Sequence, residues 1–117
     1  MYDQGHGVEQ SDDSAAQWYR KAADQGNASA QFSMGILYKY GRGVEQSDDS
    51  AAHWFRKAAD QGNASAQVNL GILYEDGRGV EQSDEEAAHW FRKAADEGHA
   101  SAQLSMGILY EEGRGVE

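Results

Sequence analysis

Histidine side chains are the groups in this sequence whose recurrence first suggests a metal site. His53 and His89 lie 36 residues apart, at the same place in two similar stretches of the chain. Stacked copies of such a stretch hold equivalent residues about 10 Å apart, the usual separation of packed helices, whereas zinc needs each ligand at about 2 Å. His6 and His99 stand where other copies have Arg and Asn. We therefore expect all four histidines at the surface, with no metal site.

Runs of acidic residues could bind calcium or act as a general acid and base. Asp48-Asp49 and residues 84–86 are such runs, but they lack the Asp-x-Asp-x-Asp-Gly spacing of an EF-hand loop. Each run begins a predicted helix, where the helix dipole favours negative charge. We therefore expect these carboxylates to start helices and not to form a site.

Gly-Arg-Gly motifs recur at residues 41–43, 77–79 and 113–115. They differ from phosphate-binding loops because they follow a predicted helix and lack the Gly-Lys-Ser/Thr ending. The serines begin helices or recur in every copy, and none is paired with a histidine and an orienting acid. Cysteine is absent, which excludes disulfides, thiolate catalysis and cysteine-based zinc sites. The sequence therefore indicates a non-enzymatic protein without a cofactor.

The composition is that of a folded, acidic protein. The 117 residues are 39% hydrophobic and 26% charged, with a net charge of −10. Because such a surface repels nucleic-acid phosphates and anionic membranes, we expect neither as a partner. No run approaches the roughly 18 apolar residues of a membrane-spanning helix, and residues 1–5 do not resemble a signal peptide. A natural start at Met1 would imply the cytoplasm, whereas a removed signal peptide would imply a secreted or periplasmic protein.

A 36-residue repeat organises the whole chain. Residues 41–76 and 77–112 are identical at 28 of 36 positions, and all 14 glycines fall at equivalent positions of the repeat. The predicted units of this single array over residues 1–117 are a partial repeat 1–27, full repeats 28–63 and 64–99, and a partial repeat 100–117.

One predicted helix of each repeat carries a recurring pattern of alanines and aromatic residues around a tryptophan. In residues 47–60, the apolar side chains share one face at 100° per residue and the charged ones share the other. Ser47 is a suitable N-cap, Ser83 with Glu86 fits a capping box, and Gly62 lies where a left-handed residue ends a helix.

The other predicted helix of the repeat, represented by residues 64–76, ends at Gly77. Gly71 in its middle costs about 1 kcal/mol relative to Ala, which indicates that another helix crosses too closely for a Cβ. We expect Val80, in the following loop, to fold back into the core. Short loops force neighbouring helices to be antiparallel, so the chain is predicted to be an all-α, right-handed α-solenoid of about six helices.

The repeat resembles that of a known family, and the resemblance covers essentially the whole chain. The run Ala-x-x-x-Leu-Gly-x-x-Tyr-x-x-Gly-x-Gly-Val over residues 66–80, followed by Ala-x-x-Trp-Phe-Arg-Lys-Ala-Ala-x-x-Gly over residues 87–98, resembles the Sel-one-like repeat family, whose members are related to tetratricopeptide repeats. Glu81 and Ser83 stand where that family often has Pro and Asp. The resemblance implies a helical scaffold that binds proteins, with the Leu-Gly helices on its concave face.

The Leu-Gly helices also carry a second, shorter apolar patch with a polar edge. An apolar strip of this kind is what a bound helix or extended peptide uses, and several of its positions differ between near-identical copies. Alternatively, Val68 and Ile72 simply pack against the next repeat. The candidate partner-binding residues are Phe32, Ser33, Ile36, Lys39, Tyr40, Ser65, Val68, Asn69, Ile72, Asp76, Ser101, Leu104, Ser105, Ile108 and Glu112.

Negative charge increases along the chain. Residues 5–40 contain four acidic and three basic residues, residues 41–76 contain six and three, and residues 77–112 contain eight and three. This gradient would steer a basic partner towards the C-terminal end. The alternative is an acidic surface that only keeps the protein soluble.

Three functions fit these observations. The leading hypothesis is a non-enzymatic scaffold that binds a partner peptide or helix on the concave face. A second is a structural, consensus-like unit, or an excerpt of a longer array, whose uncapped ends stack end to end. The third, an enzyme, rests only on resemblance, because some cysteine-rich members of the family are linked to β-lactam and cell-wall chemistry.

Overall fold

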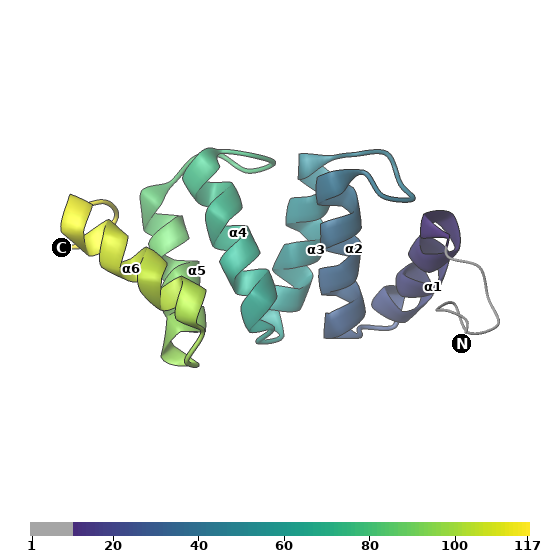
Figure 1. Cartoon of the computed structure of the whole chain (residues 1–117), viewed down its shortest axis with the longest axis horizontal. Coiled ribbons are helices and arrows are strands. Elements are labelled where there is room, and N and C mark those ends of the chain that lie inside the picture. The colour runs from purple at the N-terminus through teal and green to yellow at the C-terminus, as the bar shows by residue number, and fades with distance from the viewer. Residues whose placement is uncertain (1–10) are drawn as a thin grey trace.

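The computed structural model describes residues 11–117, which form six α-helices in a row (Figure 1). This confirms the predicted all-α repeat fold. One expectation, the surface position of His6, lies outside the described residues. The helices are α1 (Asp12–Asp24), α2 (Ala28–Tyr40), α3 (Asp48–Asp60), α4 (Ala64–Asp76), α5 (Asp84–Asp96) and α6 (Ala100–Glu112).

The tryptophan helices α1, α3 and α5 all begin at a serine cap. The hydroxyl oxygens of Ser11, Ser47 and Ser83 each accept the backbone N–H three residues further on, at 3.1 Å. The reciprocal half of the predicted capping box is not formed, because the Ser83 N–H donates to the carbonyl of Tyr74 at 3.0 Å. That bond ties the long loop to the end of α4.

The Leu-Gly helices α2, α4 and α6 differ in how they begin. Asn27 and Asn63 accept the N–H of the third helical residue at 2.8 Å, whereas His99 starts α6 with no side-chain cap bond. All three helices end at a glycine in the left-handed region, as at Gly77 with φ of 69°. Only glycine adopts this conformation without strain.

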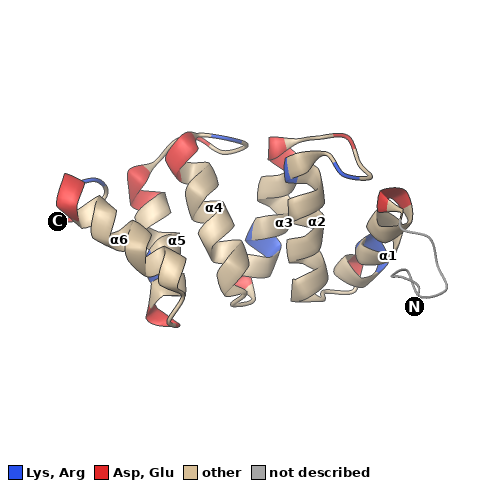
Figure 2. Cartoon of the chain, in the orientation of Figure 1, with Lys and Arg blue, Asp and Glu red and all other residues tan. Residues whose placement is uncertain are grey.

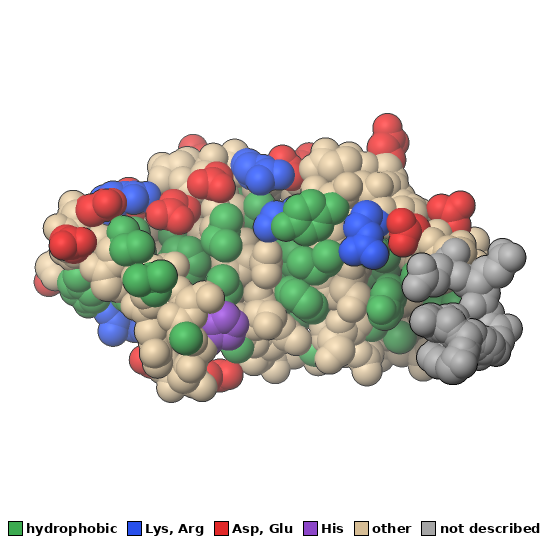
Figure 3. Space-filling view, in the orientation of Figure 1, with side chains coloured by type: hydrophobic (Ala, Val, Ile, Leu, Met, Phe, Trp, Pro, Cys, Tyr) green, Lys and Arg blue, Asp and Glu red, His purple; other side chains and the backbone are tan. Residues whose placement is uncertain are grey.

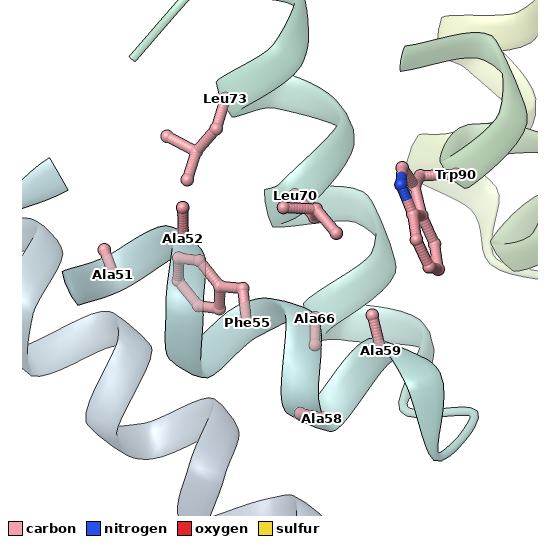
Figure 4. Packing of buried hydrophobic residues seen from close by; sticks show 9 residues of the cluster. All are labelled: Ala51, Ala52, Phe55, Ala58, Ala59, Ala66, Leu70, Leu73 and Trp90. Carbon is pink, nitrogen blue, oxygen red and sulfur yellow. The ribbon is translucent and has the colours of Figure 1, made fainter. Parts of the chain in front are cut away.

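The antiparallel helix pairs stack into an array of 53 × 28 × 23 Å. Because α2 packs on α3, and α4 on α5, the core continues from one pair to the next. Figure 4 shows Phe55 and Leu70 between α3 and α4, with Trp90 approaching from α5. Val80 packs against this cluster, which confirms that the loop folds back. Within residues 11–117, no helix is long and apolar enough to cross a bilayer.

An aromatic ring lies on a glycine wherever one helix pair meets the next inside the chain. A Cβ on Gly35 would come within 2.5 Å of the Phe55 ring, and a Cβ on Gly71 within 2.7 Å of the Phe91 ring. Real Cβ atoms do not approach carbon atoms this closely. The close crossing predicted at Gly71 is therefore confirmed, and the crossing element is α5.

Candidate partner-binding face

The exposed sides of α2, α4 and α6 form one continuous surface, which we call the inner face. These helices lie in front of α3 and α5 in Figure 1, and α2 also contacts α4 directly. Figure 3 shows this side of the molecule, with hydrophobic side chains along its middle and many acidic side chains along one edge. The candidate residues from the sequence lie on these three helices.

The apolar middle of the inner face is largely used to pack one helix pair on the next. Val68 is only 8% exposed and belongs to the cluster formed by α4, α5 and α6. The Phe32 ring lies 5.9 Å from the Phe55 ring. Ile36 and Ile72 are half-buried against the clusters of the following pair. This region therefore supports the packing interpretation, and Val68 in particular does not offer its side chain to a partner.

The equivalent residues of α6 are exposed. Leu104, in the same column as Val68, is 67% exposed, and Ile108 is also exposed. Within residues 11–117, no helix packs on this side of α6, which is why the exposure of the same column differs between α4 and α6.

The last turns of the three Leu-Gly helices form a polar edge that we call the rim, made of Lys39, Tyr40, Glu75, Asp76, Glu111 and Glu112. At its N-terminal end, Tyr40 is 61% exposed. The Lys39 ammonium lies 5.3 Å from the centre of the Tyr40 ring and donates to the amide oxygen of Asn69 at 3.2 Å. The structure thus brings together three candidate residues from α2 and α4.

The rest of the rim is acidic. Arg114 donates to the carboxylates of Glu75, at 3.1 Å, and Glu112, at 2.9 Å, while Asp76 and Glu111 are exposed. Figure 2 shows these acidic helix ends along one edge of the array. Negative charge at a helix C-terminus opposes the helix dipole and costs about 0.3–1 kcal/mol per residue. Helix stability therefore does not explain the two rim acids that Arg114 does not contact, Asp76 and Glu111.

Four serines extend the inner face away from the rim. Ser65 and Ser101 are exposed, and Ser33 and Ser105 are half-buried. The Ser65 carbonyl accepts a hydrogen bond from the Asn69 amide at 2.9 Å. These side chains offer hydroxyl groups beside the apolar middle.

Comparison with known proteins places the chain in a repeat family. The model of the Sel1 repeat matches residues 1–27, 28–63, 64–99 and 100–117. The chain belongs to the Sel1 repeat family. Sel1 repeats typically mediate protein–protein interaction and are generally not enzymes. A search of curated proteins finds no match to the chain.

Three solved structures are similar to most of the chain, and two of them are, by name, a Sel1 repeat protein and a protein with an SLR fold. A Sel1 repeat protein from Oxalobacter formigenes is 42% identical with a TM-score of 0.92, over 99% of this chain and 48% of that one. The protective antigen c5321 of uropathogenic Escherichia coli, which has an SLR fold, is 39% identical with a TM-score of 0.93, over 97% of this chain and 24% of that one. Cysteine-rich protein B of Helicobacter pylori is 26% identical with a TM-score of 0.73, over 80% of this chain and 68% of that one. The chain therefore spans less than half the length of the first two proteins.

An arginine–aspartate pair ties each Sel1 unit to the one before it, and the sequence analysis missed this pair. Arg78, in the loop after α4, donates to both carboxylate oxygens of Asp48 at the start of α3, at 3.0 and 3.3 Å. Arg114 makes the equivalent pair with Asp84. These hydrogen bonds hold the pKa of Asp48 and of Asp84 below the usual range and raise the pKa of Arg114. The recurrence of arginine and aspartate 30 residues apart was the available signal.

The remaining side chains that could bind a metal or act in catalysis include the histidines, two of which pack beside aromatic rings of the repeat. His53 and His89 lie edge-on to the neighbouring rings of Trp54 and Trp90, with centroids 5.2 and 5.0 Å apart, and both histidines are exposed. Across residues 11–117, no three metal-binding side chains gather at one place.

Proposed function

We propose that this Sel1 array binds a basic segment of a partner protein along the inner face, with the rim as the edge that recognises it. The observation that carries the proposal is the acidic end of α4 and α6. Asp76 and Glu111 are exposed at helix C-termini, where the helix dipole opposes their negative charge. Lysine or arginine side chains of a partner would remove that repulsion.

The differences between repeats support the same surface. Positions that are exposed and also differ between near-identical repeats are free from packing constraints. Tyr40, Asp76 and Glu112 occupy one column of the repeat, and all three are exposed. An exposed tyrosine beside a lysine suits an interface, since aromatic residues are enriched among the residues that contribute most to binding.

The two ends of the rim predict the direction of the bound segment. Lys39 and Tyr40 lie at the α2 end, and Glu111 and Glu112 lie at the α6 end. We expect the basic residues of the partner to lie over α4 and α6 and an apolar residue to contact Tyr40. Because the attraction is between exposed charges, added salt should weaken it.

Selection from a random peptide library tests this proposal. Displayed peptides of about 12 residues, long enough to cross three helices in extended form, are selected on the immobilised chain. The selected peptides should be rich in lysine and arginine, and a labelled one should bind more weakly as salt rises in a fluorescence anisotropy titration. Selected peptides with no excess of basic residues would contradict the proposal.

A matched pair of charge changes locates the surface. The variant Asp76→Lys with Glu111→Lys should weaken binding at least about tenfold, the scale of losing close charge pairs. The control, Asp60→Lys with Asp96→Lys, makes the same charge change at exposed ends of α3 and α5, on the opposite edge of the array. It should change affinity by less than about threefold. Equal losses in both variants would show a general charge effect and no specific rim.

A further inference from the structure

One position of the rim changes the sign of its charge between repeats. Glu75 and Glu111 occupy this position in α4 and α6, and Lys39 occupies it in α2. The change matters for the loop that follows the next Leu-Gly helix. Arg114, in the loop after α6, donates to the carboxylate of Glu75 at 3.1 Å. The equivalent residue in the loop after α4 is Arg78, whose counterpart on α2 is an ammonium group instead of a carboxylate.

The hydrogen bonds of the two arginines differ accordingly. The Nη2 atom of Arg114 donates to Glu75 as well as to the aspartate that matches Asp48. The Nε and Nη2 atoms of Arg78 donate to Asp48. Lys39 offers no acceptor for the second N–H of this Nη2 atom, because an ammonium group only donates. The α2 side of Arg78 therefore presents donors from two cationic side chains.

The Lys39 ammonium is held in place by a side chain that also differs between repeats. Asn69 stands where α2 and α6 have Ser33 and Ser105. Its amide oxygen accepts a hydrogen bond from Lys39 at 3.2 Å, and its amide nitrogen donates to the Ser65 carbonyl at 2.9 Å. Because the second bond fixes the orientation of the amide, the ammonium is already positioned before a ligand binds. Such preorganisation lowers the entropy lost on binding.

Two carboxylates lie near these cations, but neither forms an ion pair with Lys39. The pKa of Asp48 is lowered chiefly by its hydrogen bond with Arg78 and more weakly by the charge of Lys39. The pKa of Arg78 is raised by the hydrogen bond with Asp48 and more weakly by the charge of Asp76. Within residues 11–117, no carboxylate pairs with the Lys39 ammonium. The positive charge of Lys39 is therefore available to a ligand.

We propose that Lys39 and Arg78 bind one acidic side chain, aspartate or glutamate, of the segment that occupies the inner face. Its carboxylate takes the place that the Glu75 carboxylate has beside Arg114, and it accepts from both the ammonium and the guanidinium. The acidic ends of α4 and α6 bind the basic residues, so the segment carries opposite charges at its two ends. This inference rests on the proposed function, because it names a further group on the same segment.

A ligand group with a single negative charge suits this site. The neighbouring Asp48 and Asp76 repel an anion, and the repulsion grows in proportion to its charge. A carboxylate brings one negative charge, whereas a phosphorylated side chain brings about two. The net charge of −10 on the chain acts in the same direction. The site therefore favours an acidic residue over a phosphorylated one.

Peptides selected from the displayed library test the inference separately from the proposed function. The proposed function expects an excess of basic residues, whereas the inference expects one aligned position rich in aspartate or glutamate. Such a position supports the inference whatever the content of basic residues, and its absence overturns the inference. Selection on Lys39→Glu should lose the acidic position, because this variant places a carboxylate where the ligand's carboxylate binds. An acidic position that persists on Lys39→Glu would also overturn it.

A double-mutant cycle measures the contact itself. A selected peptide is compared with the same peptide in which the acidic residue is changed to its amide. The wild-type chain should bind the acidic peptide about five- to tenfold more tightly, the scale of one partly exposed charge pair. Lys39→Met, which removes the ammonium and keeps an unbranched apolar chain, should bind the two peptides equally within about twofold. If the variant keeps the wild-type preference for the acidic peptide, Lys39 does not bind the carboxylate.

A matched charge reversal separates binding from folding. Lys57→Glu makes the same change as Lys39→Glu in the last turn of another helix, α3, at an exposed position. Lys39→Glu should weaken binding of the acidic peptide at least about tenfold and Lys57→Glu less than about threefold. The melting temperature of Lys39→Glu should be the higher of the two, because its carboxylate can pair with Arg78. Equal losses of affinity, or a lower melting temperature for Lys39→Glu, would contradict the proposed site.

Discussion

The same surface of the repeat is buried on α4 and open on α6. Val68 is 8% exposed under α5, whereas Leu104, in the same column, is 67% exposed. The Gly71 position is covered by an aromatic ring, and the Gly107 position meets nothing in the described chain. Burial is therefore not a property of a residue's place within its repeat. It is set by the neighbouring repeat, as expected for an array in which each unit contacts only those beside it.

The largest expected effect compares two aromatic residues of one column. Phe91 is buried on Gly71, and Tyr19 is exposed at the open α1 surface. Phe91→Ala should lower the free energy of unfolding by about 3–5 kcal/mol, the usual cost of emptying a buried aromatic site. Tyr19→Ala should cost less than about 1 kcal/mol. Urea unfolding of dilute protein measures the free energy of unfolding of both variants. Similar losses in the two variants would contradict the expected difference between a buried and an exposed site.

The next comparison is between the N-terminal caps of an interior helix, α4, and the last helix, α6. Asn63 caps α4 through its side chain, and His99 makes no such bond at α6. Asn63→Ala should lower the free energy of unfolding by about 1 kcal/mol, and His99→Asn should raise it by about 0.5–1 kcal/mol by supplying the missing cap. Thermal unfolding monitored by circular dichroism reads both changes. A loss of stability in His99→Asn would show that the imidazole has a role beyond the cap position.

The smallest expected effect concerns the arginine–aspartate tie. Its hydrogen bond from Arg78 lowers the pKa of Asp48 below the usual 3.8 in the folded state. The ionised carboxylate therefore adds stability above that pH, and this stability is lost as pH falls from about 5 through the lowered folded-state pKa. Because the pair is partly exposed, Asp48→Asn should cost less than about 1 kcal/mol at pH 7.

The pH dependence of the free energy of unfolding checks this effect, with Asp49→Asn as the control. Asp49 neighbours Asp48 in the first turn of α3 but is exposed. Asp48→Asn should flatten the loss of stability between about pH 5 and 2.5, and Asp49→Asn should keep more of the wild-type slope. Equal slopes in the two variants would show that the Arg78–Asp48 pair does not cause this pH dependence.

Much of the fold follows from local signals in the sequence. Serine and asparagine caps, terminal glycines and helical periodicity depend only on nearby residues, which is why the starts at Ser47 and the ends at Gly77 agree with the structure. Gly71 indicated even a tertiary contact, because a costly glycine inside a helix needs a close neighbour to explain it.

The candidate face was harder to predict because packing and partner binding select the same residues. An apolar strip such as Val68 and Ile72 has the same helical spacing whether a partner or the next repeat covers it. Gln67 shows the opposite problem. It is polar yet buried, and its side-chain amide donates to the Ala59 carbonyl at 3.2 Å. Only contacts between distant parts of the chain distinguish these cases.

The aromatic ring that packs on glycine at each junction also fixes the spacing between helix pairs. Because the ring fits only where the helix lacks a Cβ, each helix pair lengthens the array by the same distance. Packed helices are about 8–10 Å apart, and an extended chain advances about 3.3 Å per residue. A segment lying across the Leu-Gly helices would therefore meet a new repeat about every three residues. The array would therefore recognise ligand side chains that recur with that period. A longer array would recognise more side chains at the same spacing.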